Sequence, residues 1–204
     1  MNSSTDLVIA PISPDEWKSF STLLTELQKV DRTDLYLPVA RLQLLNLLHS
    51  PEFQPRTTET AIRARKVAFN IASFTWPGWG DLGDISHQNQ ELGQSAARYA
   101  LELEEQYDTP SMEVLWMNGA HELNVRNYNH AREFFLQAES VADNEELKCM
   151  PRTWIALTEY IHDPADVNKE KLDHALEQLR TKNKKNGNFY AEQISAALQV
   201  YKTS

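Results

Sequence analysis

Histidines and acidic residues are the side chains of this sequence that could hold a metal or transfer a proton. His121 and Glu122 begin the pattern by which some proteases bind zinc on a helix, in which a second histidine follows one turn later. That position is Val125. The histidines fall mostly near the ends of expected helices, where capping and exposure to solvent are common. We therefore expect no metal and no cofactor, and the six histidines are His49, His87, His121, His130, His162 and His174.

The remaining acidic pairs and the single thiol favour structural roles. Residues 104 and 105 are both glutamate, as are 145 and 146, and adjacent side chains point in different directions on a helix, which predicts a solvated face. Cys149 is the only cysteine and has Leu147 and Met150 beside it, which favours a buried thiol over a nucleophile. We therefore expect no catalysis. A small helical enzyme would need polar groups that converge from separate helices, and it remains the less favoured alternative.

Two groups of basic residues could contact a partner. Arg63 and Lys66 lie three positions apart on one helix face, so they could meet an acidic peptide or pair with glutamates of the fold. The other group ends an expected helix, where cations complement the helix dipole, and this explanation is favoured over a nucleic-acid site. Its members are Arg180, Lys182, Lys184 and Lys185.

The overall charge also limits the choice of partners. The chain has 20 basic and 29 acidic residues, a formal net charge of -9, which argues against a nucleic-acid binder and against attraction to anionic membranes. No apolar run approaches the roughly twenty residues that span a bilayer. The start of the chain lacks the layout of a secretion signal. We expect a cytoplasmic protein with no nucleic-acid and no membrane partner.

Apolar residues recur at helical spacing along most of the chain, and no segment alternates as a half-buried strand would. The pattern predicts an all-α fold of about nine antiparallel helices, with residues 1–12 as a flexible N-terminus and 13–204 as a single domain. The expected helices begin after a start signal at 13–16 and continue through 35–48, 57–76, 91–107, a pair within 115–143, and three more around 147–161, 172–179 and 190–201.

Small and aromatic residues recur at fixed distances within 115–143. Gly119 and Ala131 would allow two helices to approach closely, and Phe135 and Ala138 continue the face of Ala131. Tyr128 would pack over the turn before it. This spacing resembles one tetratricopeptide repeat, most clearly over 111–143. The departures from the family pattern are Leu115 at its tryptophan, Asn118 at its leucine, Glu122 at its tyrosine and Asp143 at its proline.

The resemblance implies a right-handed α-α superhelix that acts as a protein-protein interaction module or scaffold and binds a peptide or partner protein in a concave groove. It places five residues of the first helix toward that groove, with Trp116 as the chief candidate for contact. The five are Glu113, Trp116, Ala120, Leu123 and Asn124. Trp116 and Ala120 stand where the members that hold acidic chaperone tails have a cation and an asparagine, so an adaptor of that kind is not expected. Self-assembly into a homodimer is the alternative.

A second unusual stretch, from Thr75 to Asp84, holds half of the glycines and two of the five tryptophans. Pro77 cannot continue a helix, so the stretch must interrupt one. Trp76 and Trp79 could contact a partner from a recognition loop. The favoured interpretation is a connection whose tryptophans fill the end of the core.

Overall fold

The computed structural model describes residues 14–29, 33–49, 58–80, 85–107 and 110–203. The segment 1–12, expected to be a flexible N-terminus, lies outside these ranges. The described ranges contain nine α-helices, one short 3-10 helix and no strand, which confirms the predicted all-α class. The elements are α1 (Pro14–Lys29), α2 (Thr33–His49), α3 (Thr58–Phe74), the 3-10 helix η2 (Pro77–Trp79), α4 (His87–Tyr107), α5 (Met112–Asn124), α6 (Tyr128–Val141), α7 (Glu145–His162), α8 (Asp166–Lys182) and α9 (Gly187–Thr203).

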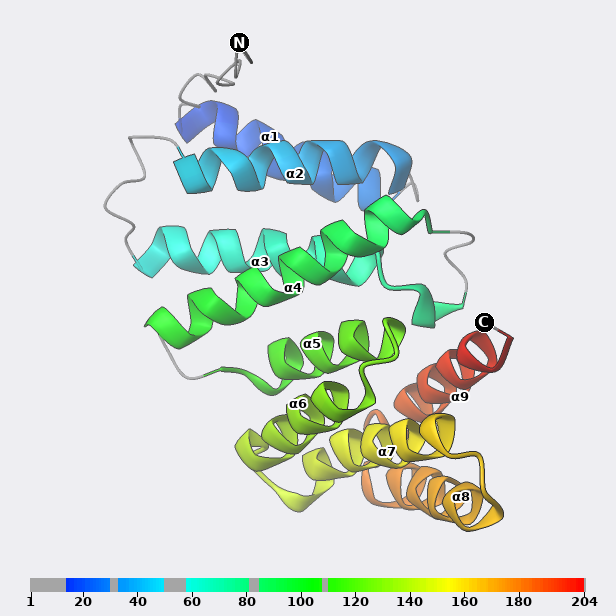
Figure 1. Cartoon of the computed structure of the whole chain (residues 1–204). Coiled ribbons are helices and arrows are strands. Elements are labelled where there is room, and N and C mark those ends of the chain that lie inside the picture. Colours follow the sequence, from blue (N-terminus) through cyan, green and yellow to red (C-terminus); the bar gives the residue numbers. More distant parts are fainter. Residues whose placement is uncertain (1–13, 30–32, 50–57, 81–84, 108–109, 204) are drawn as a thin grey trace.

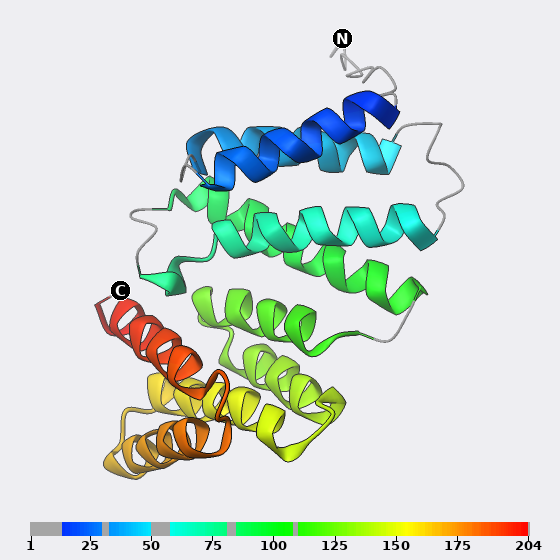
Figure 2. The same ribbon diagram turned by 180° about the vertical axis from the view of Figure 1, so that it is seen from behind.

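Helices that follow one another in the sequence pack on one another from α1 to α9, and α9 also packs on α7. Figures 1 and 2 show α1 and α2 at one end, α3 and α4 next, and α5 to α8 beyond them. The last helix turns back toward the middle of the molecule, where it contacts η2. The connection that follows α3 therefore lies against the last helix of the chain.

Local signals fix where the central helices begin and end. The Ser111 hydroxyl accepts from the Val114 backbone N–H at the start of α5. After α5, the N–H of Asn127 donates to the Glu122 carbonyl and that of Arg126 to the Leu123 carbonyl, which is a Schellman turn. Arg126 has a φ of 59°, so it occupies the left-handed position where glycine is usual. This turn sends the chain back as α6.

The α5–α6 hairpin is tightly packed around its small residues. The pair in close contact is Gly119 and Phe135, whereas Gly119 and Ala131 were expected. Ala131, Phe135 and Ala138 are fully buried. A Cβ atom on Gly119 would lie 2.6 Å from Cε1 of Phe135, so the glycine makes room for this ring. Tyr128 is half-buried against the core and makes an edge-to-face contact with His162, with 4.7 Å between ring centroids.

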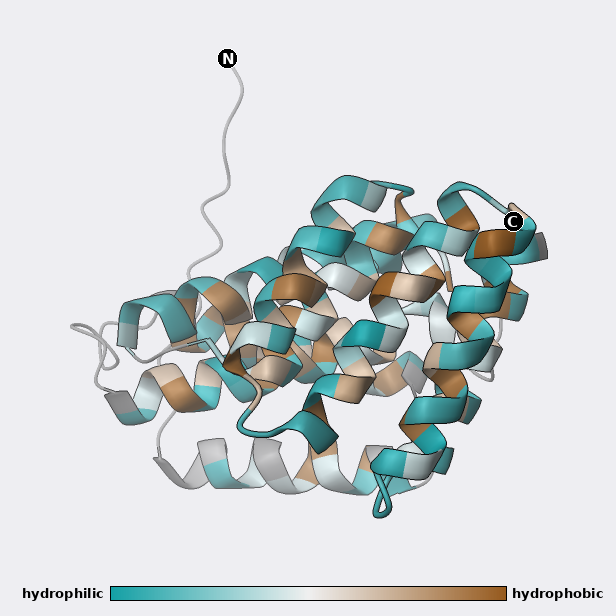
Figure 3. Cartoon of the chain, turned by 90° about the horizontal axis from the view of Figure 1, so that it is seen from below, coloured by the Kyte–Doolittle hydropathy of each residue, from teal (hydrophilic) through white to brown (hydrophobic). Residues whose placement is uncertain are grey.

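Helix α5 is the centre of the molecule. Every residue from Val114 to Leu123 is buried, because α3, α4, α6 and η2 all pack on this helix. The outer helices instead alternate hydrophilic and hydrophobic residues along their length (Figure 3). None of the helices in the described ranges combines the length and apolar composition that a bilayer-spanning segment requires.

Candidate functional site

Four tryptophans from three parts of the chain form one aromatic cluster in the interior. The ring of Trp76 lies 5.2 Å from that of Trp79 and 5.6 Å from those of Trp116 and Trp154. Trp116 and Trp154 are 5.7 Å apart, and Phe135 stacks on Trp154 at 5.6 Å. Edge-to-face contacts at these distances are favourable for aromatic rings. The cluster joins η2, α5, α6 and α7 into one core.

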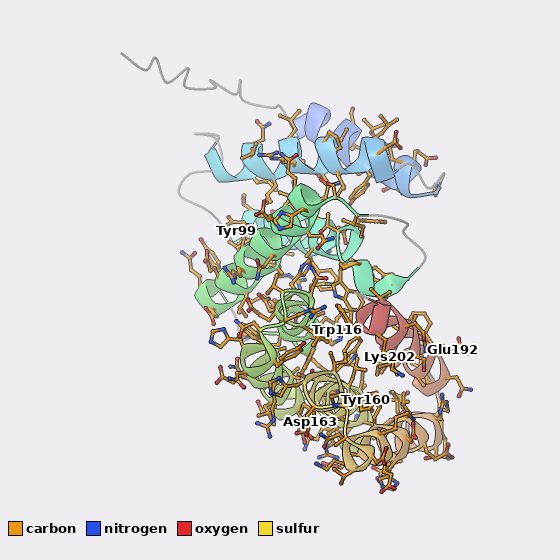
Figure 4. The ribbon with its side chains drawn as sticks, turned by 45° about the vertical axis from the view of Figure 1, so that its right-hand side comes forward. Tyr99, Trp116, Tyr160, Asp163, Glu192 and Lys202 are labelled. Atoms are coloured by element: carbon orange, nitrogen blue, oxygen red, sulfur yellow. The ribbon has the colours of Figure 1, made fainter. Side chains whose placement is uncertain are left out.

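Helix α9 and η2 close this cluster on one side. The indole N–H of Trp76 donates both to the Tyr201 hydroxyl oxygen at 2.9 Å and to the Ala120 carbonyl at 3.1 Å. Burial raises the pKa of Tyr201 well above its usual value of 10. Trp116 lies where α5 faces α9 (Figure 4), and Nζ of Lys202 lies 5.4 Å from the ring centroid of Tyr160 on α7. Helix α9 therefore packs on η2 and α7 beside the tryptophan cluster.

This packing corrects the expectation that α5 lines an open groove. Trp116 is 6% exposed, Leu123 is 1% exposed, and Ala120 and Trp76 are fully buried. The physical reason is that η2 packs on α5, and the rings of Trp76, Trp79 and Trp154 lie against Trp116. Trp79 is half-buried, and its indole N–H donates to the Ser73 carbonyl at 2.7 Å. Trp76, which precedes η2, and Trp79 within it therefore pack as part of the core, as in a connection whose tryptophans fill the end of the core.

The other expected contact residues lie at the surface or near it. Glu113 is exposed, and Asn124 is half-buried and donates to Oε1 of Gln90 at 3.0 Å. Arg63 and Lys66 are both exposed on α3, but Arg63 is already paired with Glu59 on its own helix. Their role in partner binding stays a prediction.

Two buried carboxylates were not anticipated from the sequence. Glu104 was expected on a solvated face, but it is 7% exposed. Its carboxylate pairs with Arg65 at 2.7 Å and accepts hydrogen bonds from the backbone N–H and the hydroxyl of Ser111 at 2.6 and 3.0 Å. These contacts tie α3 and α4 to the start of α5. The sequence gives no signal for them, because the partners lie 39 and 7 residues away.

Glu122 plays the corresponding role at the other end of α5. It is 4% exposed, pairs with Arg98 of α4 at 2.8 Å, and accepts hydrogen bonds from Asn127 at 2.7 Å and Gln94 at 3.3 Å. Ionised groups inside a protein need such partners to offset the loss of hydration. Both carboxylates are thus paired and hydrogen-bonded within the fold.

His121 is a buried titratable group that borders a small cavity. It is 1% exposed, and its Nε2 lies 3.0 Å from the Ala72 carbonyl, so Nε2 carries the proton in the neutral ring. Its Nδ1 has no hydrogen-bond partner. The ring borders a cavity of about 30 Å³ with Gln90 and Asn124. Desolvation lowers the pKa of His121 to about 4, against smaller opposing effects of the Ala72 hydrogen bond and Glu122. The ring is therefore neutral at pH 7.

Within the described ranges, no three histidine, cysteine or acidic side chains gather as metal ligands would. Cys149 is buried as expected, and its thiol donates to the Glu145 carbonyl at 3.3 Å.

An open groove lies instead between α2 and the first turns of α4. We call it the α2/α4 groove; its volume is about 450 Å³. Apolar side chains of both helices line it, with polar groups at its edges. The lining residues are Leu37, Pro38, Leu42, Leu45 and Leu92, with Asp34, Arg41, Gln88 and Asn89. Sequence reasoning missed it because it depends on how α2 and α4 approach each other.

No family model, curated protein or solved structure matches this chain.

Proposed function

We propose that this chain is a non-catalytic, tetratricopeptide-like helical repeat protein that binds a peptide or partner protein. Its helices pack as neighbours in sequence order, which is how repeat stacks are built. The α5–α6 hairpin buries the small and aromatic residues that carry the resemblance. These two properties support the repeat architecture and its right-handed superhelix.

The α2/α4 groove is the single observation that carries the binding proposal. Leu42 is 40% exposed there, and Leu45 and Leu92 are half-buried, so the groove offers accessible apolar surface. Grooves between helices bind segments through a few aliphatic or aromatic side chains that fill them. The proposed binding surface is therefore formed by α2 and α4, away from the covered side of α5.

The test compares two leucine variants in the full chain. Peptides of 12 residues are selected against the native protein from a displayed library, and their affinities are measured by fluorescence polarisation. Leu42→Glu should weaken binding by about tenfold, because losing one buried aliphatic contact costs about 1.5 kcal/mol. Leu136→Glu on α6 is the matched control, since Leu136 is 39% exposed.

Circular dichroism must first show that both variants are folded. A library that yields no binder would contradict the proposed function. If Leu136→Glu abolishes the binding of the selected peptides and Leu42→Glu does not weaken it, the peptides do not bind in the α2/α4 groove. Sedimentation of the native protein separates peptide binding from the alternative of a homodimer, in which the groove would be covered by a second copy.

A further inference from the structure

Arg41 is an exposed cation at the edge of the α2/α4 groove. It forms no ion pair and no hydrogen bond with any residue in the described ranges. Arg63, Arg65, Arg98, Arg132 and Arg152, in contrast, each pair with a glutamate. Arg126 and Arg180 also have no ion pair within the described ranges. Arg41 differs from them because it lines the α2/α4 groove beside apolar side chains, in a chain whose net charge is -9.

Asp34 also borders the groove, but it already takes part in an interaction within the chain. It stands seven residues before Arg41, which is about 10 Å along a helix. No ion pair joins Asp34 to Arg41 in the described ranges. The other polar side chains that line the groove are the uncharged amides of Gln88 and Asn89 on α4.

We propose that the α2/α4 groove binds a peptide segment in which an aliphatic side chain is followed or preceded, within one helical turn, by an aspartate or glutamate. The aliphatic side chain fills the space between Leu42, Leu45 and Leu92, and the carboxylate pairs with Arg41. The planar guanidinium fork suits a carboxylate, which it can contact through two parallel hydrogen bonds. This inference rests on the proposed function and specifies the partner of the same groove.

The experiment uses the peptides selected against the native full chain and a charge-swapped twin of each, in which every acidic residue is replaced by lysine. Binding is measured for the native protein, Arg41→Glu and Arg180→Glu. Arg180 is the matched control, because it is exposed on α8 and has no ion pair within the described ranges. Both substitutions change the net charge equally.

The acidic peptides should lose about tenfold in affinity for Arg41→Glu and less than twofold for Arg180→Glu, since reversing one charge replaces attraction by repulsion. The lysine twins should bind Arg41→Glu better than the native protein. Selected peptides without acidic residues, or acidic peptides that Arg41→Glu does not weaken, would overturn the inference and leave the proposed function intact. A library without any binder would overturn both. A dimer of the native protein that Arg41→Glu dissociates would show a second copy as the occupant and would also overturn the inference.

Discussion

Single side chains in this protein show how burial sets their chemistry. His121 is held neutral because its ring is desolvated and its one proton is committed to the Ala72 carbonyl. His121 and Glu122 begin a zinc-binding pattern in the sequence, but Val125 stands where its second histidine would be. What the sequence did not reveal is that the ring is buried, because its carbonyl partner lies 49 residues earlier.

The lowered pKa of His121 predicts that stability depends on pH. Above pH 6.5 the ring is neutral in both the folded and unfolded chain. As the pH falls from 6.5 to 4, the unfolded chain takes up a proton that the folded chain does not, so stability decreases. The loss at pH 4 should be about 3 kcal/mol.

His121→Gln provides the control, because its amide nitrogen can still donate to the Ala72 carbonyl but does not titrate. Urea unfolding between pH 7 and pH 4 should show a smaller decrease in the free energy of unfolding for this variant than for the native protein. An equal decrease in both proteins would contradict the assignment of the pH dependence to His121.

At the scale of the elements, sequence periodicity identified the helices well. The expected helix 91–107 corresponds to α4 from His87 to Tyr107, and the expected pair within 115–143 corresponds to α5 and α6. The reason is that apolar spacing and turn residues act locally. The packing partner of Gly119 was less well predicted. Ala131 was expected to face Gly119, but the ring of Phe135 lies against it.

The close contact between Gly119 and Phe135 predicts that a larger residue at position 119 destabilises the α5–α6 hairpin. Gly119→Ala should destabilise the protein by about 1–3 kcal/mol, because a Cβ would overlap the buried ring. This outcome opposes the gain of about 1 kcal/mol expected from helix propensity alone. Chemical denaturation measures the change in the free energy of unfolding.

A double substitution tests whether the ring is the cause. Phe135→Leu removes Cε1 and Cζ, two of the three ring atoms nearest to a Cβ at position 119, so Gly119→Ala should cost less in that background than in the native protein. Additive effects of the two substitutions would show that the cost of Gly119→Ala has another origin.

At the scale of the whole molecule, the return of α9 to η2 decides which surfaces are available. The repeat resemblance concerns one hairpin and carries no information on a contact such as Trp76 to Tyr201, which joins residues 125 positions apart. For that reason Trp116, Ala120 and Leu123 were expected at a groove but lie in the interior. The α2/α4 groove was missed on the same physical ground, because it is formed by helices that are not consecutive.

The hydrogen bond from Trp76 to Tyr201 should contribute to the attachment of α9. Tyr201→Phe keeps the ring and removes the hydroxyl oxygen, so we expect a loss of about 1 kcal/mol in the free energy of unfolding. The loss should be small because the indole N–H retains the Ala120 carbonyl as acceptor. Thermal unfolding followed by tryptophan fluorescence measures it, and an unchanged midpoint would show that the hydroxyl is not needed.

The contact between Trp76 and Tyr201 also has a consequence for the order of events on the ribosome. The indole leaves the ribosome 125 residues before its phenol partner. At synthesis rates of about 5–20 residues per second, the nascent chain spends roughly 6–25 seconds with Trp76, and for part of that time Trp116, lacking their C-terminal cover. An unfinished chain thus presents an aromatic surface that the completed protein hides, so each interrupted round of translation releases a product suited to recognition by chaperones and proteases.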